Sequence, residues 1–356
     1  MAKAKLATAG GSTGSRETTG RALDASKNAA AAQAPIWMEY LRLLRAPNVF
    51  TAIADVTMGY VAVTAGDVQI PTLAILIAAS AMLYMAGMVL NDVFDVEIDR
   101  KERPQRPLPS EKIPLGVATR LGWGLLAGGV VLAIVAGAFA MHNEVTGRGT
   151  LFWRPGLIGI LLAGAIVLYD RFAKATVAGP LVMGSCRLLN VLLGMSVAAP
   201  FPGMSLLALG YDAAEWTIAL GIGTYIVGLT CFARTEADRP SKAWLILGMI
   251  VMAIGVFLLA WWPRYAPFDM PLRISSDYLL PGLLLVISAF AVFGECLRAI
   301  RHPKPEIVQY AVKWSILALI LFDATLVLAL GTPTQAAGVA ALYVAALLVG
   351  SAVYST

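Results

Sequence analysis

Hydrophobic residues along the chain gather into long blocks that carry no charge. Blocks without any Asp, Glu, Lys or Arg cover residues 68–91, 121–143, 188–211, 243–263 and 331–356. A helix that crosses a bilayer needs about 20 predominantly apolar residues to span about 30 Å. The pattern therefore predicts membrane-spanning helices, which we place at 48–65, 71–92, 116–141, 155–170, 177–199, 214–233, 243–262, 278–297, 307–330 and 334–355.

The composition disfavours most other classes of protein. Hydrophobic residues make up 58% of the 356 residues and charged residues 14%, and the mean hydropathy is +0.74. Soluble domains carry about 25% charged residues. A soluble enzyme, a disulfide-stabilised secreted domain and a disordered chain are therefore disfavoured. We predict an all-α integral membrane protein.

Basic residues concentrate in alternate loops. The N-terminal segment and the loops after every second span hold most of the Lys and Arg residues. Such loops stay on the cytoplasmic side of a membrane, so we expect a cytoplasmic N-terminus in a multi-pass protein of the plasma membrane. The net charge of +5 then requires no nucleic-acid partner. Residues 1–34, rich in Ala, Gly, Ser and Thr, are predicted to form a disordered cytoplasmic tail.

The most informative polar stretch follows the second span. If that helix continues past the membrane edge, Asn91, Asp95 and Asp99 recur every fourth residue on one face, with Asp92 beside them. Stacked carboxylates repel one another, and a divalent cation removes this repulsion. Hard oxygen ligands suit Mg²⁺, which shares its coordination with substrate phosphates. The stretch predicts a metal and diphosphate site, and the alternative is a solvated acidic helix end. Basic residues that would complete the anion site follow directly: Arg100, Lys101, Arg103 and Arg106.

Three segments together resemble a known family. They are Asn-Asp-x-x-Asp-x-x-x-Asp from Asn91, Glu-Arg-Pro-Gln-Arg-Pro-Leu-Pro-Ser at 102–110, and Arg-Leu-Leu-Arg-Ala-Pro-Asn at 42–48. Through these segments the chain resembles the UbiA superfamily of intramembrane prenyltransferases. The resemblance as a whole covers about residues 36–330. Phrases at 169–171, 184–190 and 232–236 are most similar to its EboC-like branch.

The resemblance implies a nine-helix transmembrane bundle around a cavity that opens to lipid. Residues 35–330 would form this domain, and 331–356 would add a C-terminal transmembrane helix. An allylic isoprenyl diphosphate would bind through Mg²⁺ to the acidic motif. The resemblance makes Asn91, Asp95 and Asp99 catalytic and metal-binding residues, with Asp92 as a neighbouring ligand. Residues expected to bind substrate are Arg45, Asn48, Arg103, Arg106, Lys174, Arg187 and Asn190.

Two positions depart from the family pattern. The usual second acidic motif after the sixth span is reduced to Glu236 and Asp238. On a helix these two residues would point about 160° apart. A loop could still bring both to a metal, and the alternative is a solvated, ion-paired loop. The family often has Tyr-x-x-x-Lys after the fourth span, whereas here Lys174 follows Tyr169 by five residues, out of register.

Polar residues inside the spans are costly and usually face a cavity or a partner. Arg187 and Asn190 are three residues apart and share a face of the fifth span. They either bind diphosphate or belong to an internal ion pair, with Asp55 or Asp323 as the acidic partner.

The leading hypothesis is a magnesium-dependent prenyltransferase. It would transfer an isoprenyl group from an allylic diphosphate to a small hydrophobic acceptor, aromatic or other, within the lipid bilayer. The alternative, supported by the altered second motif, is a non-catalytic relative that binds or transports a polyprenoid or its precursor.

Overall fold

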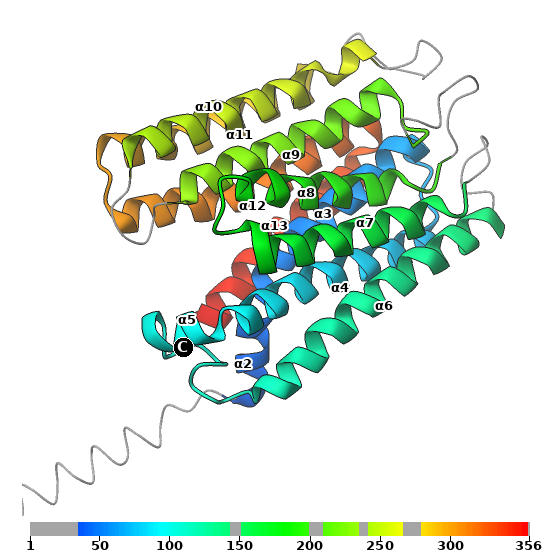
Figure 1. Ribbon diagram of the computed structural model, residues 1–356. Coiled ribbons are helices and arrows are strands. Elements are labelled where there is room, and N and C mark those ends of the chain that lie inside the picture. Colours follow the sequence, from blue (N-terminus) through cyan, green and yellow to red (C-terminus); the bar gives the residue numbers. More distant parts are fainter. Residues whose placement is uncertain (1–34, 143–150, 199–208, 235–240, 266–278, 355–356) are drawn as a thin grey trace, which may run out of the picture.

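The computed structural model describes residues 35–142, 151–198, 209–234, 241–265 and 279–354. These residues form an all-helical bundle without strands (Figure 1). The long helices are α3 (Ala46–Thr64), α4 (Ile70–Phe94), α6 (Leu115–His142), α7 (Arg154–Leu168), α8 (Gly179–Met195), α9 (Ala213–Ala233), α10 (Lys242–Trp261), α11 (Leu279–Arg301), α12 (Pro305–Leu330) and α13 (Pro333–Tyr354). The short elements are α2 (Ile36–Leu43), α5 (Val96–Glu102), the π-helix η1 (Tyr169–Ala173) and the 3₁₀-helix η3 (Trp262–Tyr265).

Each predicted span overlaps one of the long helices. In the described part of the chain, eight helices are long and apolar enough to cross a membrane. The shorter apolar helix α8 has 17 residues. The protein is therefore a multi-pass integral membrane protein with an all-α fold.

The helix starts follow local sequence signals. Proline occupies one of the first two positions of α3, α4, α7, α8 and α12, where its missing N–H costs no hydrogen bond. Helix α9 begins with a capping box: the Asp212 carboxylate accepts from the Glu215 N–H at 2.7 Å, and the Glu215 carboxylate accepts from the Asp212 N–H at 2.9 Å.

Two glycines allow α3 and α8 to cross closely. A Cβ atom on Gly59 would lie 2.4 Å from the Val191 carbonyl oxygen, and one on Gly194 would lie 2.2 Å from the Val56 carbonyl oxygen. Both distances are far below van der Waals contact, so no larger residue fits without moving the helices. Small residues have this role in membrane bundles. The crossing brings polar side chains of the two helices together.

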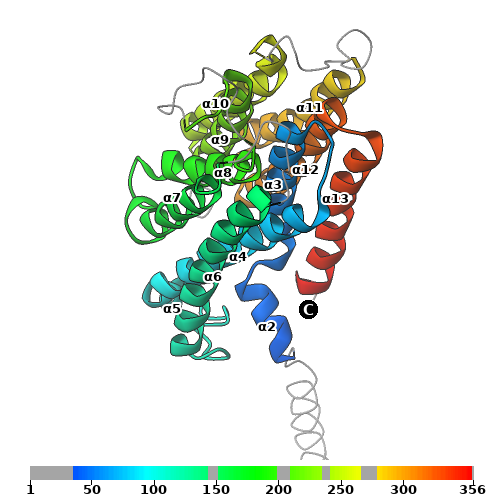
Figure 2. The ribbon, with the colours of Figure 1, turned by 90° about the vertical axis from the view of Figure 1, so that its right-hand side faces the viewer.

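The C-terminal helix α13 packs against α3 and α12 at one edge of the bundle (Figure 2). Near its start, Gln335 Nε2 donates to the Gly66 carbonyl oxygen at 2.7 Å. Near its end, the Val353 carbonyl oxygen accepts from Arg42 Nε at 3.1 Å. The separation of 331–356 from a nine-helix core stays a prediction.

Helices α2 and α5 lie at one end of the bundle (Figure 1), and they share a small hydrophobic core of their own with the loop that precedes α6. Its buried residues include Leu43, Val96, Leu108 and Ile113. The loop is also tied to α2 by Lys112, whose Nζ lies 2.7 Å from a Glu39 carboxylate oxygen. This packing fixes the segment that carries the basic residues after the acidic stretch.

Candidate functional site

The acidic face forms where α4 passes into α5. The helix does not continue unbroken past this point, because α4 ends at Phe94 and Asp95 adopts φ −93° and ψ 0° before α5 begins. The four-residue repeat nevertheless survives. The Asp95 N–H donates to the Asn91 carbonyl at 3.0 Å, and the Asp99 N–H donates to the Asp95 carbonyl at 2.8 Å. Asn91, Asp95 and Asp99 are therefore presented together, as predicted.

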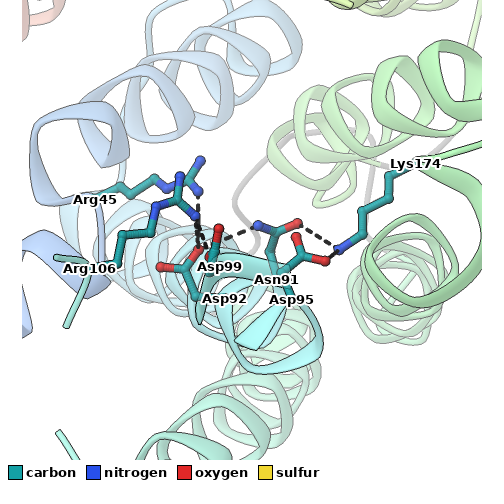
Figure 3. Close-up of polar contacts among 7 residues, drawn as sticks. All are labelled: Arg45, Asn91, Asp92, Asp95, Asp99, Arg106 and Lys174. Carbon is teal, nitrogen blue, oxygen red and sulfur yellow. Dashed lines mark hydrogen bonds and ion pairs between the residues drawn. The ribbon is translucent and has the colours of Figure 1, made fainter. Parts of the chain in front are cut away.

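Cations from three separate parts of the chain meet this face (Figure 3). Arg45 NH2 lies 3.2 Å from Asp92 Oδ1. Arg106 NH1 lies 3.5 Å from the same oxygen and 2.7 Å from Asp99 Oδ2. The side chains of Asp92 and Asp99 are only 8% and 5% exposed, so their charges act in a medium of lowered dielectric, where Coulomb interactions are stronger than in water.

Arg45 reaches the cluster of Asn91, Asp92, Asp95 and Asp99 with their cations from an unusual turn. It lies between α2 and α3 with φ 46° and ψ 48°, the left-handed region that residues other than glycine seldom adopt. Strained residues of this kind concentrate at functional sites. The conformation directs the side chain toward Asp92 (Figure 3). Sequence alone gave no sign of this turn.

Lys174 is the third cation, and its position corrects the expected loss of register. Helix α7 ends in the π-helix η1, in which the Lys174 N–H donates to the Tyr169 carbonyl at 3.1 Å. A π-turn holds one residue more than an α-turn, so the five-residue spacing is absorbed. Lys174 Nζ lies 3.4 Å from Asn91 Oδ1 and forms an ion pair with Asp95. Both contacts are drawn in Figure 3.

A cavity of about 60 Å³ opens among α3, α4, α7, η1 and α8. Its walls are largely apolar, including Leu83, Leu162 and Ile166. Gly87, one helical turn before Asn91, also lines it. The cavity therefore lies about one helical turn from Asn91, toward the middle of the bundle.

Arg187 and Asn190 do face this cavity, yet their strongest contacts are internal. Arg187 NH1 lies 2.7 Å from Asp55 Oδ2 and NH2 donates to Thr51 Oγ1 at 2.6 Å. Asn190 Nδ2 donates to the Ala52 carbonyl at 2.9 Å. Of the two alternatives from the sequence, the structure has the internal ion pair, with Asp55 as the partner. A role in substrate binding stays a prediction.

The remaining predicted residues lie outside the cluster. Arg103 is exposed, because the chain turns after α5 and brings Arg106 to the carboxylates in its place. Asn48 lines a different cavity, between α3, α12 and α13. Glu236 and Asp238 lie outside the described residues.

One candidate escaped the sequence analysis. Asp170, in η1, is 4% exposed, lines the cavity, and has a buried Oδ2 without a hydrogen-bond partner among the described residues. A carboxylate four residues before Lys174, at the end of an apolar span, is the signal that could have drawn attention to it.

The donor set suits Mg²⁺ in its chemistry. Asn91, Asp92, Asp95 and Asp99 offer hard oxygen atoms along one face. The partners of the carboxylates are cations, apart from Asn91 Nδ2, which donates to Asp92 Oδ1 at 3.4 Å. Among the described residues, no group of three or more His, Cys, Asp or Glu side chains is arranged to hold a metal ion. Mg²⁺ seldom needs such a group, since it commonly binds one or two carboxylates together with waters and substrate phosphates.

The fold and the site define a class of protein: a helical membrane protein with a carboxylate and cation cluster one helical turn from a largely apolar cavity inside the bundle. Residues 52–268 match the UbiA prenyltransferase family. The chain belongs to this family. The attribution to the EboC-like branch stays a prediction.

Relatives of similar sequence are named digeranylgeranylglyceryl phosphate synthases. The protein from Metallosphaera sedula is 31% identical over 156 residues, which cover 44% of this chain and 50% of the relative. The protein from Methanocaldococcus jannaschii is 30% identical over 196 residues, which cover 51% of this chain and 66% of the relative. The chain thus spans about half to two thirds of the length of these relatives.

Solved structures share the fold. A UbiA homologue from Aeropyrum pernix without ligand has a TM-score of 0.55 at 15% identity, covering 79% of this chain and 96% of that one. A UbiA homologue from Archaeoglobus fulgidus bound to DMAPP and Mg²⁺ has a TM-score of 0.52 at 16% identity, and the match covers 79% of this chain and 99% of the homologue. At these identities the likeness concerns the fold alone.

Proposed function

We propose that this protein is a magnesium-dependent prenyltransferase that transfers an isoprenyl group from an allylic diphosphate to a small acceptor within the membrane. The observation that carries the proposal is the cluster itself. Arg45, Arg106 and Lys174 contact the oxygen-bearing side chains of α4 and α5 one helical turn from the apolar cavity. A diphosphate with an isoprenyl tail has the same division between a highly charged head and an apolar chain.

The residues of the cluster would bind and polarise the diphosphate. Bound Mg²⁺ supplies positive charge to the phosphate oxygens as the bond between carbon and oxygen breaks. Arg45, Arg106 and Lys174 add fixed positive charge where the leaving group becomes more negative. Leu162 and Ile166 line the cavity and exclude water from the allylic carbon, which protects the reactive carbon from hydrolysis.

The loop that holds Glu236 and Asp238 would supply further metal ligands on the other side of the diphosphate. Because it has only two acidic residues, its contribution would be smaller than that of the first acidic motif. The acceptor would enter through the same cavity. The relatives named for a glyceryl phosphate product and the homologue bound to DMAPP and Mg²⁺ support this choice of substrate class.

We further propose a cytoplasmic N-terminus, with the 95–114 segment on the same side. The support is the concentration of Lys and Arg in that segment, in the N-terminal segment and in every second later loop, since such loops stay in the cytoplasm.

The test is release of diphosphate from geranyl, farnesyl and geranylgeranyl diphosphate by purified protein, with Mg²⁺ and after chelation. We expect release only with Mg²⁺. Asp95→Asn keeps the size of the side chain but removes its charge, and should lower release at least about 100-fold, typical of losing an electrostatic catalytic contact. Glu97→Gln is a matched control on the exposed side of α5. Failure of the wild-type protein with all substrates would favour the non-catalytic alternative.

A further inference from the structure

Asp170 lines the cavity and carries a buried carboxylate with one unsatisfied oxygen. The residue is 4% exposed and its Oδ2 has no hydrogen-bond partner among the described residues. Leaving a buried acceptor unsatisfied costs free energy, and a hydrogen-bond donor on a bound molecule would remove that cost. The molecule that enters this cavity should therefore bring a hydroxyl or another N–H or O–H group.

The depth of Asp170 relates it to the reacting carbon. Lys174, four residues further on, contacts Asn91 and Asp95 in the cluster. At about 1.5 Å per residue, four residues of helix place Asp170 roughly 6 Å deeper. Gly87, one turn before Asn91 on the facing helix α4, lines the same part of the cavity. A diphosphate held at the cluster would put its first allylic carbon at this level.

The charged groups that act most strongly on Asp170 are Lys174, Asp95, Arg45 and Asp92. None of them forms a hydrogen bond or ion pair with it, whereas Lys174 is already held by Asp95. Asp170 thus lies next to the cluster but is not part of its network of ion pairs. The residue lines the cavity, on the side where an acceptor, rather than the diphosphate, would lie.

We propose that Asp170 binds a hydroxyl-bearing acceptor and takes its proton as the acceptor attacks. This inference rests on the proposed prenyltransferase function. The acceptor oxygen forms a bond with the allylic carbon, and the bond from that carbon to the diphosphate oxygen breaks with its electron pair. The hydroxyl proton passes to the Asp170 carboxylate, and the product is an ether. An aromatic carbon nucleophile carries no hydrogen-bond donor at the attacking atom and would leave Oδ2 unsatisfied.

The experiment compares a hydroxyl acceptor with a thiol acceptor. The full-length protein receives geranylgeranyl diphosphate, Mg²⁺ and either a 1-O-alkylglycerol or its thiol analogue, at a pH where much of the thiol is ionised. For Asp170→Asn we expect kcat with the alcohol to fall at least about 100-fold, the usual range for loss of a general base. With the thiol, which needs no base, kcat should fall less than about threefold.

Further variants separate this role from a structural one. Asp170→Glu retains a carboxylate and should recover part of the activity with the alcohol. Asp67→Asn makes the same change at an exposed site after α3 and should have no effect. Activity of Asp170→Asn with the thiol also shows that the variant is folded. The KM for the diphosphate and the half-saturating Mg²⁺ concentration should match those of the wild type.

The contrary results are distinct. Equal losses with alcohol and thiol would overturn the proposal, since the residue would then serve structure or diphosphate binding. A raised Mg²⁺ requirement in Asp170→Asn would make it a metal ligand. Transfer by the wild type to phenolic rings alone, unaffected in Asp170→Asn, would overturn the inference and leave the prenyltransferase function intact. No release of diphosphate by the wild type under any condition would instead refute the proposed function.

Discussion

Removing Arg187 should destabilise the protein far more than removing an exposed arginine of similar geometry. Asp55 is 0% exposed and its Oδ2 lies 2.7 Å from Arg187 NH1, while its Oδ1 is buried without a hydrogen-bond partner among the described residues. Breaking a buried ion pair from one side costs about 3–5 kcal/mol, because an uncompensated charge stays behind. For Arg187→Met we expect the free energy of unfolding to fall by about 3 kcal/mol, the lower end of this range. The reason is that Asn190 Nδ2 still donates to Asp55 Oδ2 at 3.4 Å.

The exposed pair Arg100 and Glu97 provides the control. Their atoms are 2.6 Å apart, slightly closer than in the buried pair, but the side chains are 46% and 76% exposed. Solvent screens such pairs, so Arg100→Met should cost less than about 1 kcal/mol. The two arginines differ in burial and in the further hydrogen bond that Arg187 donates to Thr51.

The assay is the free energy of unfolding from titration with a denaturing detergent. The double variant Asp55→Leu/Arg187→Met removes both charges and should return to within about 1 kcal/mol of the wild type, because apolar replacements of a buried pair are often neutral or stabilising. Equal effects of Arg187→Met and Arg100→Met would refute the reasoning. So would a double variant that is less stable than Arg187→Met alone.

Three further outcomes are expected. Glu236→Gln should lower Mg²⁺-dependent diphosphate release less than Asp95→Asn does, because the first motif keeps its full ligand set; equal losses in a side-by-side titration would mean an intact second metal site. A cysteine at Ser110 should react with an impermeant thiol reagent only from the cytoplasmic side, and labelling from the outer side would overturn the topology. An alanine inserted after the exposed Phe172 would turn Lys174 by about 100° around the helix axis and lower activity. Deletion of Phe172 restores a four-residue spacing between Tyr169 and the lysine and should be tolerated. Equal turnover by the two variants would contradict this account of η1.

Much of the fold could be predicted because membrane helices are set by local properties. Apolar blocks of about 20 residues fix where helices cross a bilayer, and every predicted span overlaps an observed helix. The acidic face was also predictable. Hydrogen bonds between residues four apart place Asn91, Asp95 and Asp99 on one face, and these bonds persist through the turn at Asp95. The sequence therefore determined the class of protein, its spans and the first acidic motif.

Only the tertiary structure decided which side chains contact the acidic residues. Lys174 contacts Asp95 across 79 positions of sequence, and Arg187 contacts Asp55 across 132. The first contact depends on a π-helix, and the second depends on a close helix crossing at Gly59. Neither periodicity nor composition encodes such pairings, because they result from packing between helices. For the same reason the spacing of Asp170 from Lys174 could only draw attention to it, and its burial beside the cavity became known from the structure.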